Sequence, residues 1–200
     1  ASALEKVAKD FPKLQFAIVD MVVDQPNVQS VVFKEQEGSF LVGLMAATAS
    51  KSGKVGFVGG MDIPLIRKFQ CGYEQGAKYA NPKAEVLANM TGTTPAAWSD
   101  PTRGGELARN QFSRGVDVVF AAAGGTGVGV YQAAKDAGKL AIGVDSNQNH
   151  LQPGTMLTSM VKRVDVAVAR AMKGVTPGLT LLGLAENAVD YALDEHNAKL

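Results

Sequence analysis

Runs of apolar residues alternate with amphipathic stretches through the middle of the chain. Apolar runs at 54–58, 84–90 and 116–121 are each followed by a segment in which apolar residues recur at helical spacing. Another apolar run occupies 140–144. Strands nearly continuous in Val, Ile and Ala that alternate with helices are typical of a parallel sheet covered on both faces. The pattern therefore predicts a doubly wound α/β lobe over residues 53–150.

The segments on either side of this lobe repeat the pattern only in part. They predict a helix at 2–9, strands at 14–20 and 31–33, and a helix at 35–49. Further along they predict a strand or crossover at 155–162, a helix at 164–172, and another strand with a turn within 179–192. These elements supply few strands for a sheet of their own. We therefore expect 1–52 to belong to a partial first lobe, 53–150 to form the second lobe, and 151–200 to cross over and return to the first.

The composition is that of a globular protein. Of the 200 residues, 46% are hydrophobic and 20% are charged, which argues against a disordered or fibrous chain. Twenty Lys and Arg against nineteen Asp and Glu leave a net charge of +1, whereas a nucleic-acid surface normally carries clustered basic charge. No apolar run approaches the roughly 20 residues that span a bilayer. The composition therefore argues against nucleic acid as a partner and against a membrane-spanning segment.

Residues that commonly carry metal or nucleophilic chemistry are scarce. Cys71 is the only cysteine, which excludes an internal disulfide, and its helical context predicts a buried thiol. His150 and His196 lie far apart, without the spacing of a metal site. The motifs Gly-x-Ser-x-Gly, His-Glu-x-x-His and the phosphate-binding loop are missing. The sequence therefore favours a binding protein, without metal or cofactor, over an enzyme.

Candidate binding residues follow the predicted strands. In open parallel sheets, ligands bind beyond the carboxyl ends of the strands. The residues in these places are Asp20, Gly59–Asp62, Thr91–Trp98, Gly124–Gly127 and Asp145–Asn147. A carboxylate there can accept hydrogen bonds from the vicinal hydroxyls of a sugar, and helix N-termini add backbone N–H donors. We therefore expect the ligand to bind among these loops.

Part of this set also fits a dinucleotide-binding fingerprint. Gly125 and Gly127 open a predicted helix after a strand, and Asp145 lies 20 residues beyond Gly125, where the acid of such a site meets a ribose. The third glycine of the pattern is replaced by Val130, whose branched side chain opposes close packing of the helix on the strand. An oxidoreductase that uses a nucleotide cofactor such as NAD stays open as an alternative, and so does a simple tight turn.

Two further residues have a structural interpretation beside a functional one, and a third has a structural interpretation alone. Trp98, the only tryptophan, either packs on the first turn of the following helix or offers a flat ring to an aromatic base. Lys162 is either a solvated neighbour of Arg163 or a donor to a ligand at a strand end. Asp62 is interpreted as the cap of a helix that starts near Pro64.

Five motifs occur in order along nearly the whole chain: FKEQEGSFL at 33–41, KVGFVGGMDIP at 54–64, FAAAGGTG at 120–127, IGVD at 142–145 and LTSMVK at 157–162. In these motifs the chain resembles the basic membrane protein family. Members of this family are substrate-binding lipoproteins of ABC transporters, typified by a bacterial purine nucleoside receptor.

This resemblance implies a fold and a set of binding residues. The fold is periplasmic-binding-protein-like, of type I, with two doubly wound lobes of parallel sheet and the ligand in a cleft between them. In the family, a purine base stacks between aromatic rings, and carboxylates, a lysine and a backbone glycine hold the ribose. On this chain, stacking falls to Trp98 and ribose binding to Gly124, Asp145 and Lys162. Asp20 matches a further acid of the cleft.

The resemblance also sets expectations for ligand, partner and location. It implies a nucleoside of the adenosine, guanosine or inosine class, an ABC permease as partner, and an extracytoplasmic location with a lipid anchor in the full-length form. The first strand of the family and the aromatic loop after it have no counterpart here, so we expect a first lobe without its N-terminal part. A family member that senses its ligand without transporting it is a further alternative.

Overall fold

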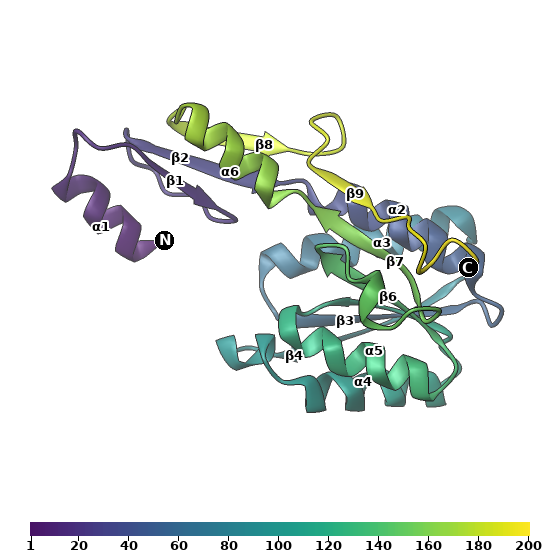
Figure 1. The fold of residues 1–200 in the computed structure, drawn as a ribbon. Coiled ribbons are helices and arrows are strands. Elements are labelled where there is room, and N and C mark those ends of the chain that lie inside the picture. Colours follow the sequence, from purple (N-terminus) through teal and green to yellow (C-terminus); the bar gives the residue numbers. More distant parts are fainter. The chain divides into compact units, whose positions relative to one another are not determined.

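The computed structural model describes residues 1–200, which form two compact units. Unit 1 comprises Ala1–Lys34 and Lys162–Val189, and unit 2 comprises Glu35–Val161 and Asp190–Leu200. Each unit therefore combines segments that are far apart in the sequence, and the chain passes between the units three times. Figure 1 labels the helices and strands along the chain.

Unit 2 is built on a largely parallel sheet with the strand order β4-β3-β5-β6-β7-β9. The strands are β3 (Lys54–Met61), β4 (Glu85–Gly92), β5 (Val118–Ala122), β6 (Leu140–Asp145), β7 (Met156–Lys162) and β9 (Val189–Tyr191). The pairs β4–β3, β3–β5, β5–β6 and β6–β7 are all parallel. Because these strands run in one direction, the loops that leave them gather at one edge of the sheet.

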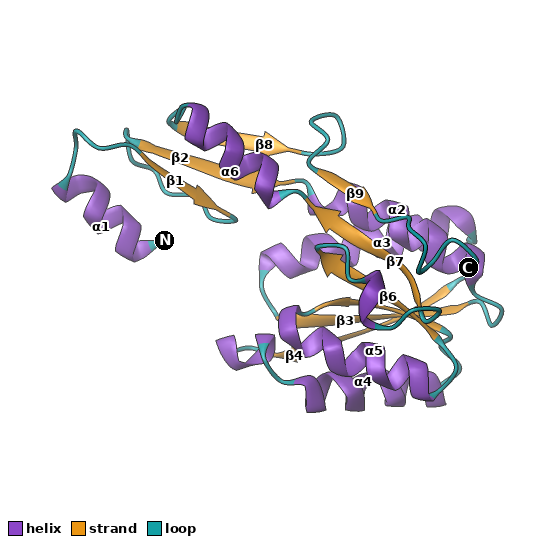
Figure 2. Ribbon diagram, in the orientation of Figure 1, coloured by secondary structure: helices purple, strands orange, loops and turns teal.

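Two pairs of helices cover the two faces of this sheet. They are α2 (Glu35–Ala49), α3 (Pro64–Ala80), α4 (Pro101–Ser113) and α5 (Gly127–Asp136). Figure 2 shows α4 and α5 on the face opposite α2 and α3. Neighbouring residues of β3 point to opposite faces. Phe57 lies against Tyr73 of α3, whereas Val58 joins the buried cluster that contains Ala108 of α4 and Tyr131 of α5.

Helices α2 and α3 approach each other closely at glycine residues. A Cβ on Gly72 would collide with the main chain of Gln36, and a Cβ on Gly76 would collide with that of Phe40. Since any other residue carries a Cβ, only glycine allows the two helix backbones to come this near. This contact attaches α2 to unit 2.

Unit 1 contains a three-stranded parallel sheet in the order β1-β2-β8. Its elements are α1 (Ser2–Asp10), β1 (Phe16–Val19), β2 (Val28–Phe33), α6 (Val164–Lys173) and β8 (Gly178–Leu182). Helix α1 is held by Asn27, whose side-chain amide donates to the carbonyl oxygens of Ala8 and Leu14 at 3.1 and 2.8 Å. A depression of about 320 Å³ lies between α6 and the sheet, lined among others by Val31 and Met172.

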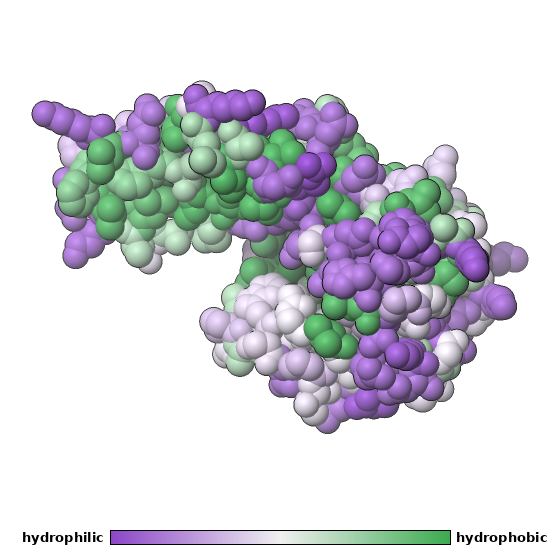
Figure 3. All heavy atoms as spheres, viewed as in Figure 1, coloured by the Kyte–Doolittle hydropathy of each residue, from purple (hydrophilic) through white to green (hydrophobic).

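Much of the apolar surface of unit 1 is exposed. Figure 3 shows hydrophobic atoms gathered over the β1, β2 and α6 region. The exposed large apolar side chains of this unit are Val7, Phe11, Leu14, Met21, Val22, Val164, Val168, Met172, Leu179, Leu181 and Leu184. A sheet of three strands has two open edges and covers little of its own apolar surface. Unit 1 therefore has a small core.

The structure confirms the predicted α/β class with parallel sheets, and it differs from the sequence analysis in several details. Residues 151–161 and 190–200 belong to unit 2, so only 162–189 of the last segment joins unit 1. The boundary after the first segment falls at Lys34, so α2 belongs to unit 2 instead of accompanying the first strands. Cys71 lies on the exposed side of α3, and the prediction of a buried thiol was wrong. The buried side of this helix carries Phe69 and Tyr73. None of the helices combines the length and the apolar character that crossing a bilayer requires.

Candidate ligand-binding site

Three of the five predicted binding residues lie at the carboxyl edge of the unit 2 sheet. Trp98 ends a short 3-10 turn, η1 (Pro95–Trp98), that follows β4; Gly124 begins another, η2 (Gly124–Thr126), after β5; and Asp145 is the last residue of β6. Gly124 and Asp145 are exposed, and Trp98 is half-buried. The parallel direction of β4, β5 and β6 therefore presents an indole, a glycine main chain and a carboxylate at one edge.

The indole of Trp98 is seated on glycines. Its six-membered ring occupies the space that a Cβ on Gly60 of β3 would take. Gly124 is a close neighbour, since a Cβ placed there would lie 3.7 Å from Cε3 of the ring and 3.3 Å from the Trp98 carbonyl oxygen. The structure thus places Trp98 beside both Gly60, which lies in the sequence motif at 54–64, and Gly124.

Thr126 fastens the Trp98 turn, a role that sequence reasoning missed. Its buried hydroxyl donates to the carbonyl oxygen of Ala97 and accepts from the backbone N–H of Asp100, both at 2.8 Å. Asp100 in turn caps α4 by accepting from the N–H of Arg103 at 2.9 Å. The only sequence signal for Thr126 is its place between two glycines after a strand, and that signal favours a turn without naming its partner.

Asp145 takes an unusual main-chain conformation. Its φ of 67° lies in the left-handed region, which residues other than glycine seldom adopt and which Asp tolerates better than most. Nearby, the hydroxyl of Tyr131 donates to Oε1 of Gln148 at 2.7 Å, and the same oxygen accepts from the N–H of Val144 at 2.9 Å. Burial raises the pKa of Tyr131 strongly, and the negative charge of Asp145 adds to this effect. The Tyr131 phenol is therefore a neutral support beneath the loop that Asp145 begins.

The other two predicted residues, Asp20 and Lys162, form an ion pair within unit 1. Oδ1 of Asp20 lies 2.6 Å from Nζ of Lys162. The ammonium also lies 5.0 Å from the centre of the Phe33 ring, within the range of a cation–π interaction. The Lys162 side chain is 4% exposed, so its interpretation as a solvated neighbour of Arg163 is wrong. Arg163 instead pairs with Asp165 at the surface, at 2.8 Å.

Asp20 also has a left-handed main chain, with φ at 66°, and its N–H donates to the Val31 carbonyl oxygen at 2.9 Å. Its side chain is 33% exposed. A carboxylate with one face to solvent can bind a hydroxyl while it keeps the lysine paired. Within unit 1, Asp20 and Lys162 thus supply an acceptor and a donor at adjoining strand ends.

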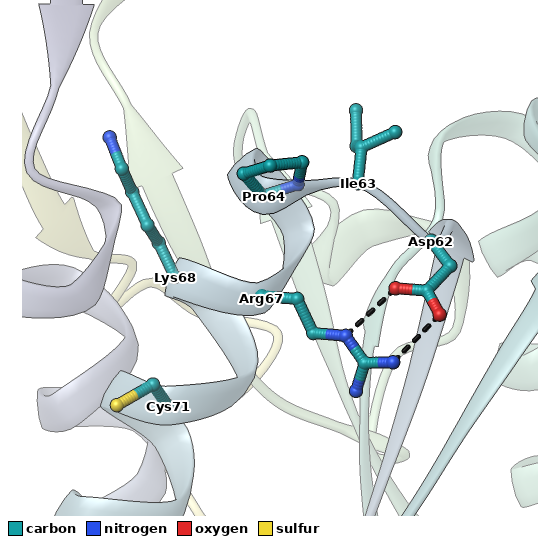
Figure 4. Close-up of a pocket in the computed structure, with 6 residues that line it drawn as sticks. All are labelled: Asp62, Ile63, Pro64, Arg67, Lys68 and Cys71. Atoms are coloured by element: carbon teal, nitrogen blue, oxygen red, sulfur yellow. Dashed lines mark hydrogen bonds and ion pairs between the residues drawn. The ribbon is translucent and has the colours of Figure 1, made fainter.

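Asp62 does not cap α3. Its carboxylate receives two hydrogen bonds from the guanidinium of Arg67, at 2.8 and 2.7 Å, and the residue before the helix is Ile63, without a side-chain cap. The hydrogen bonds that Arg67 donates to Asp62 raise the pKa of Arg67. Figure 4 shows this pair in a shallow depression of about 610 Å³ whose lining also includes Lys68 and Cys71. Because each charge of the pair already has its partner, this depression offers little to a ligand.

The dinucleotide pattern finds no support in the helix packing. Gly129 is the glycine in close contact, since a Cβ there would collide with the carbonyl group of Pro101 in α4. Val130, at the position of the third glycine, is buried in the core between helices and sheet. The close backbone contact therefore joins α5 to α4. It does not join α5 to the preceding strand, as the third glycine of a dinucleotide-binding site would require. The structure also contains no group of three or more His, Cys, Asp or Glu side chains that could hold a metal ion.

Comparison with known proteins identifies the family to which the chain belongs. A family model described as "ABC transporter substrate-binding protein PnrA-like" matches residues 1–189. The chain belongs to this family. Among curated relatives, a CD4+ T-cell-stimulating antigen of Listeria monocytogenes is 40% identical over 97% of the chain, and basic membrane protein D of Borreliella burgdorferi is 38% identical over 94%. These matches span 59% and 58% of the two relatives, so the chain covers little more than half of their length.

Solved structures confirm the predicted type of fold. An ABC transporter solute-binding protein from Aeropyrum pernix superposes with a TM-score of 0.86 at 36% identity, over 98% of this chain and 58% of that one. A transcriptional activator of the comK gene from Bacillus halodurans gives 0.84 at 26% identity, over 100% of this chain and 69% of that one. A solute-binding protein from Actinobacillus succinogenes with bound D-allose, at 18% identity and a TM-score of 0.66, shows the fold alone. The family model and the Aeropyrum pernix structure are described as substrate-binding and solute-binding proteins, which agrees with the prediction of a binding protein.

Proposed function

We propose that this protein captures a purine nucleoside for an ABC transporter. The observation that carries the proposal is the gathering of Trp98, Gly124 and Asp145 at one edge of the unit 2 sheet, where a flat ring, an open main chain and a carboxylate suit a heterocycle joined to a pentose. The family supports the substrate-binding role. The nucleoside itself is the step that we add.

Each residue has a distinct part in this proposal. Trp98 stacks on the base, a contact worth about 1–3 kcal/mol per base in other proteins. Asp145 accepts hydrogen bonds from the vicinal hydroxyls of the ribose, and bonds to an ionised acceptor are the stronger kind. Gly124 leaves room for the sugar beside its main chain. In unit 1, Lys162 is proposed to donate a hydrogen bond to the ligand, and Asp20, its ion-pair partner, to accept one from it.

Capture needs no covalent step. A ligand that binds one conformation of the protein better than another shifts the population toward it, by as much as the difference in affinity allows. A permease can then distinguish the loaded protein from the empty one. We propose an ABC permease as the partner and the extracytoplasmic side of the membrane as the location, with a lipid anchor in a longer form of the protein.

A thermal-shift panel tests the ligand class. Adenosine, guanosine and inosine are compared with NAD and with free ribose. A nucleoside at 100 times its dissociation constant should add about 2.7 kcal/mol to the free energy of unfolding, which gives a clear rise in melting temperature. A shift with NAD and none with nucleosides would support the oxidoreductase alternative and contradict the proposal.

A pair of aromatic variants tests the site. Trp98→Ala should abolish the nucleoside shift while the unliganded protein stays folded. Tyr79→Ala is the matched control, because Tyr79 is a 74% exposed aromatic residue near the end of α3, at the opposite edge of the sheet from the loops. Equal shifts in both variants would remove Trp98 from the site.

The likeness to a transcriptional activator favours ligand sensing as a second candidate function. Both candidates use the same nucleoside site, so binding does not separate them. Deletion of the gene does: loss of radiolabelled nucleoside uptake supports the transport role, whereas unchanged uptake with altered transcription supports the sensing role.

A further inference from the structure

The loop that begins at Asp145 is tied to the C-terminal segment of unit 2, residues 190–200. Oδ2 of Asp194 accepts hydrogen bonds from the side-chain amides of Asn147 and Asn149, at 2.6 and 3.1 Å. Its other oxygen, Oδ1, accepts from the N–H of His196 at 2.8 Å. One carboxylate from a distant part of the sequence thus accepts hydrogen bonds from two side chains of the loop.

Those two side chains in turn fix the main chain of the loop. Oδ1 of Asn147 accepts from the N–H of Asn149 at 3.0 Å. Oδ1 of the fully buried Asn149 accepts from the hydroxyl of Ser159 at 2.9 Å, and that hydroxyl accepts from the N–H of Gln148 at 3.0 Å. Side-chain hydrogen bonds therefore hold three successive residues, 147–149, just before and at the start of the short 3-10 helix η3 (Asn149–Leu151).

Asp194 is itself anchored. Its N–H donates to Oδ1 of Asn197 at 2.9 Å, and the buried amide of Asn197 donates to the carbonyl oxygens of Leu157 and Ala192, both at 2.9 Å. The hydroxyl of Thr158 also donates to the Ala192 carbonyl oxygen, at 2.8 Å. Because β7 carries Leu157 and Thr158, the C-terminal segment is fastened to the same sheet whose edge presents Asp145.

We propose that Asp194 is a positioning residue for the ligand-binding carboxylate of Asp145. The inference rests on the proposed function, since it concerns how that site keeps its shape. A non-glycine residue in the left-handed region persists only when its surroundings enforce it. The Asp194 hydrogen bonds enforce the course of the loop immediately after Asp145. Without them the loop gains conformations, and the Asp145 carboxylate spends less time aimed at the ribose.

The test compares two ligands that share a base. Inosine carries the vicinal hydroxyls that Asp145 is proposed to bind, and 2′,3′-dideoxyinosine lacks them. In Asp194→Ala, the dissociation constant for inosine should rise about tenfold, the effect of losing one hydrogen bond to a charged group, while that for the dideoxy compound should change little. Asp194→Asn keeps the shape of the side chain and one acceptor oxygen. Its dissociation constant for inosine should lie between those of the wild type and Asp194→Ala. Glu195→Gln removes a neighbouring charge from a side chain that is 83% exposed and should match the wild type.

Two results would overturn the inference. One is an unchanged inosine affinity in Asp194→Ala. The other is an equal loss for inosine and its dideoxy analogue, because general loosening of unit 2 would weaken both. As a check on the pair, Asp145→Ala combined with Asp194→Ala should cost no more inosine affinity than Asp145→Ala alone.

A measurement without ligand separates this inference from the proposed function. Amide hydrogen exchange at Gln148 and Asn149 should accelerate in Asp194→Ala and stay unchanged in Glu195→Gln. Failure of the wild-type protein to bind any nucleoside would contradict the proposed function, and the exchange rates would still report on the tether. Unchanged exchange in Asp194→Ala would refute the tether itself.

Discussion

The indole of Trp98 fills the space that a side chain on Gly60 would occupy. Gly60→Ala should therefore push the ring from its seat, with a loss of about 1–3 kcal/mol in the free energy of unfolding from overpacking and a change in tryptophan fluorescence. Gly92→Ala is the matched control in the neighbouring strand, because its Cβ would meet only Ala97 at an ordinary 3.6 Å. Identical fluorescence in the two variants would show that Gly60 does not seat the ring.

The Thr126 hydroxyl should stabilise the Trp98 turn measurably. Thr126→Val keeps the shape and leaves the Ala97 carbonyl oxygen and the Asp100 N–H without their partner. We expect a loss of about 1–3 kcal/mol in urea unfolding, since buried polar groups without partners are costly. Thr126→Ser retains the hydroxyl and should keep most of the stability that Thr126→Val loses. A valine variant as stable as the serine variant would contradict the role of the hydroxyl.

Removal of Asp20 should harm unit 1 more than removal of Lys162. Asp20→Ala leaves a nearly buried ammonium without its carboxylate, and breaking a fully buried pair typically costs 3–5 kcal/mol. Because Asp20 is partly exposed, we expect about 2 kcal/mol. Lys162→Met removes the charge and keeps an apolar stem, so its cost should be smaller. Chemical denaturation of both variants and of the double variant measures the difference, and the reverse order would be inconsistent with a buried cation.

Asp194 should make stability depend on pH in acid. The hydrogen bond from Asn147 lowers the pKa of Asp194 below its ordinary value of 3.8. A carboxyl group with a lower pKa in the folded state stabilises that state above its unfolded pKa and loses the contribution as pH falls through the folded pKa. The difference in melting temperature between wild type and Asp194→Asn should thus be constant above about pH 5 and shrink below about pH 4. A difference that grows in acid would contradict this assignment.

Local pattern was sufficient for most of the secondary structure. The apolar runs predicted β3, β5 and β6 because strands buried on both faces must be apolar throughout. Asp100 followed by Pro101 predicted the start of α4, and the side chain caps the helix as expected. These features depend on residues that are neighbours in the chain.

The environment of individual side chains could not be predicted as well from the sequence. Cys71 shares its helix with Phe69 and Tyr73, and the side of α3 that is buried depends on where α2 packs. The burial of Lys162 depends on Asp20, far away in the sequence. Asp62 was expected to cap a helix and instead pairs with Arg67 one turn later, because a bidentate guanidinium competes well for a carboxylate.

By itself, the sequence determined the α/β class, the order of the elements and the placement of Trp98, Gly124 and Asp145 at strand ends or in the loops that leave them. Hydrophobic period and turn chemistry, which decide these features, are local properties. The roles of these three as ligand-binding residues stay a prediction. Tertiary structure alone decided that Gly60 seats the indole, that Thr126 fastens its turn and that Asp194 holds the loop after β6. Each of these contacts joins segments that come together only when the sheet has formed. Local hydrophobic periodicity carries no information on which distant residues will be neighbours.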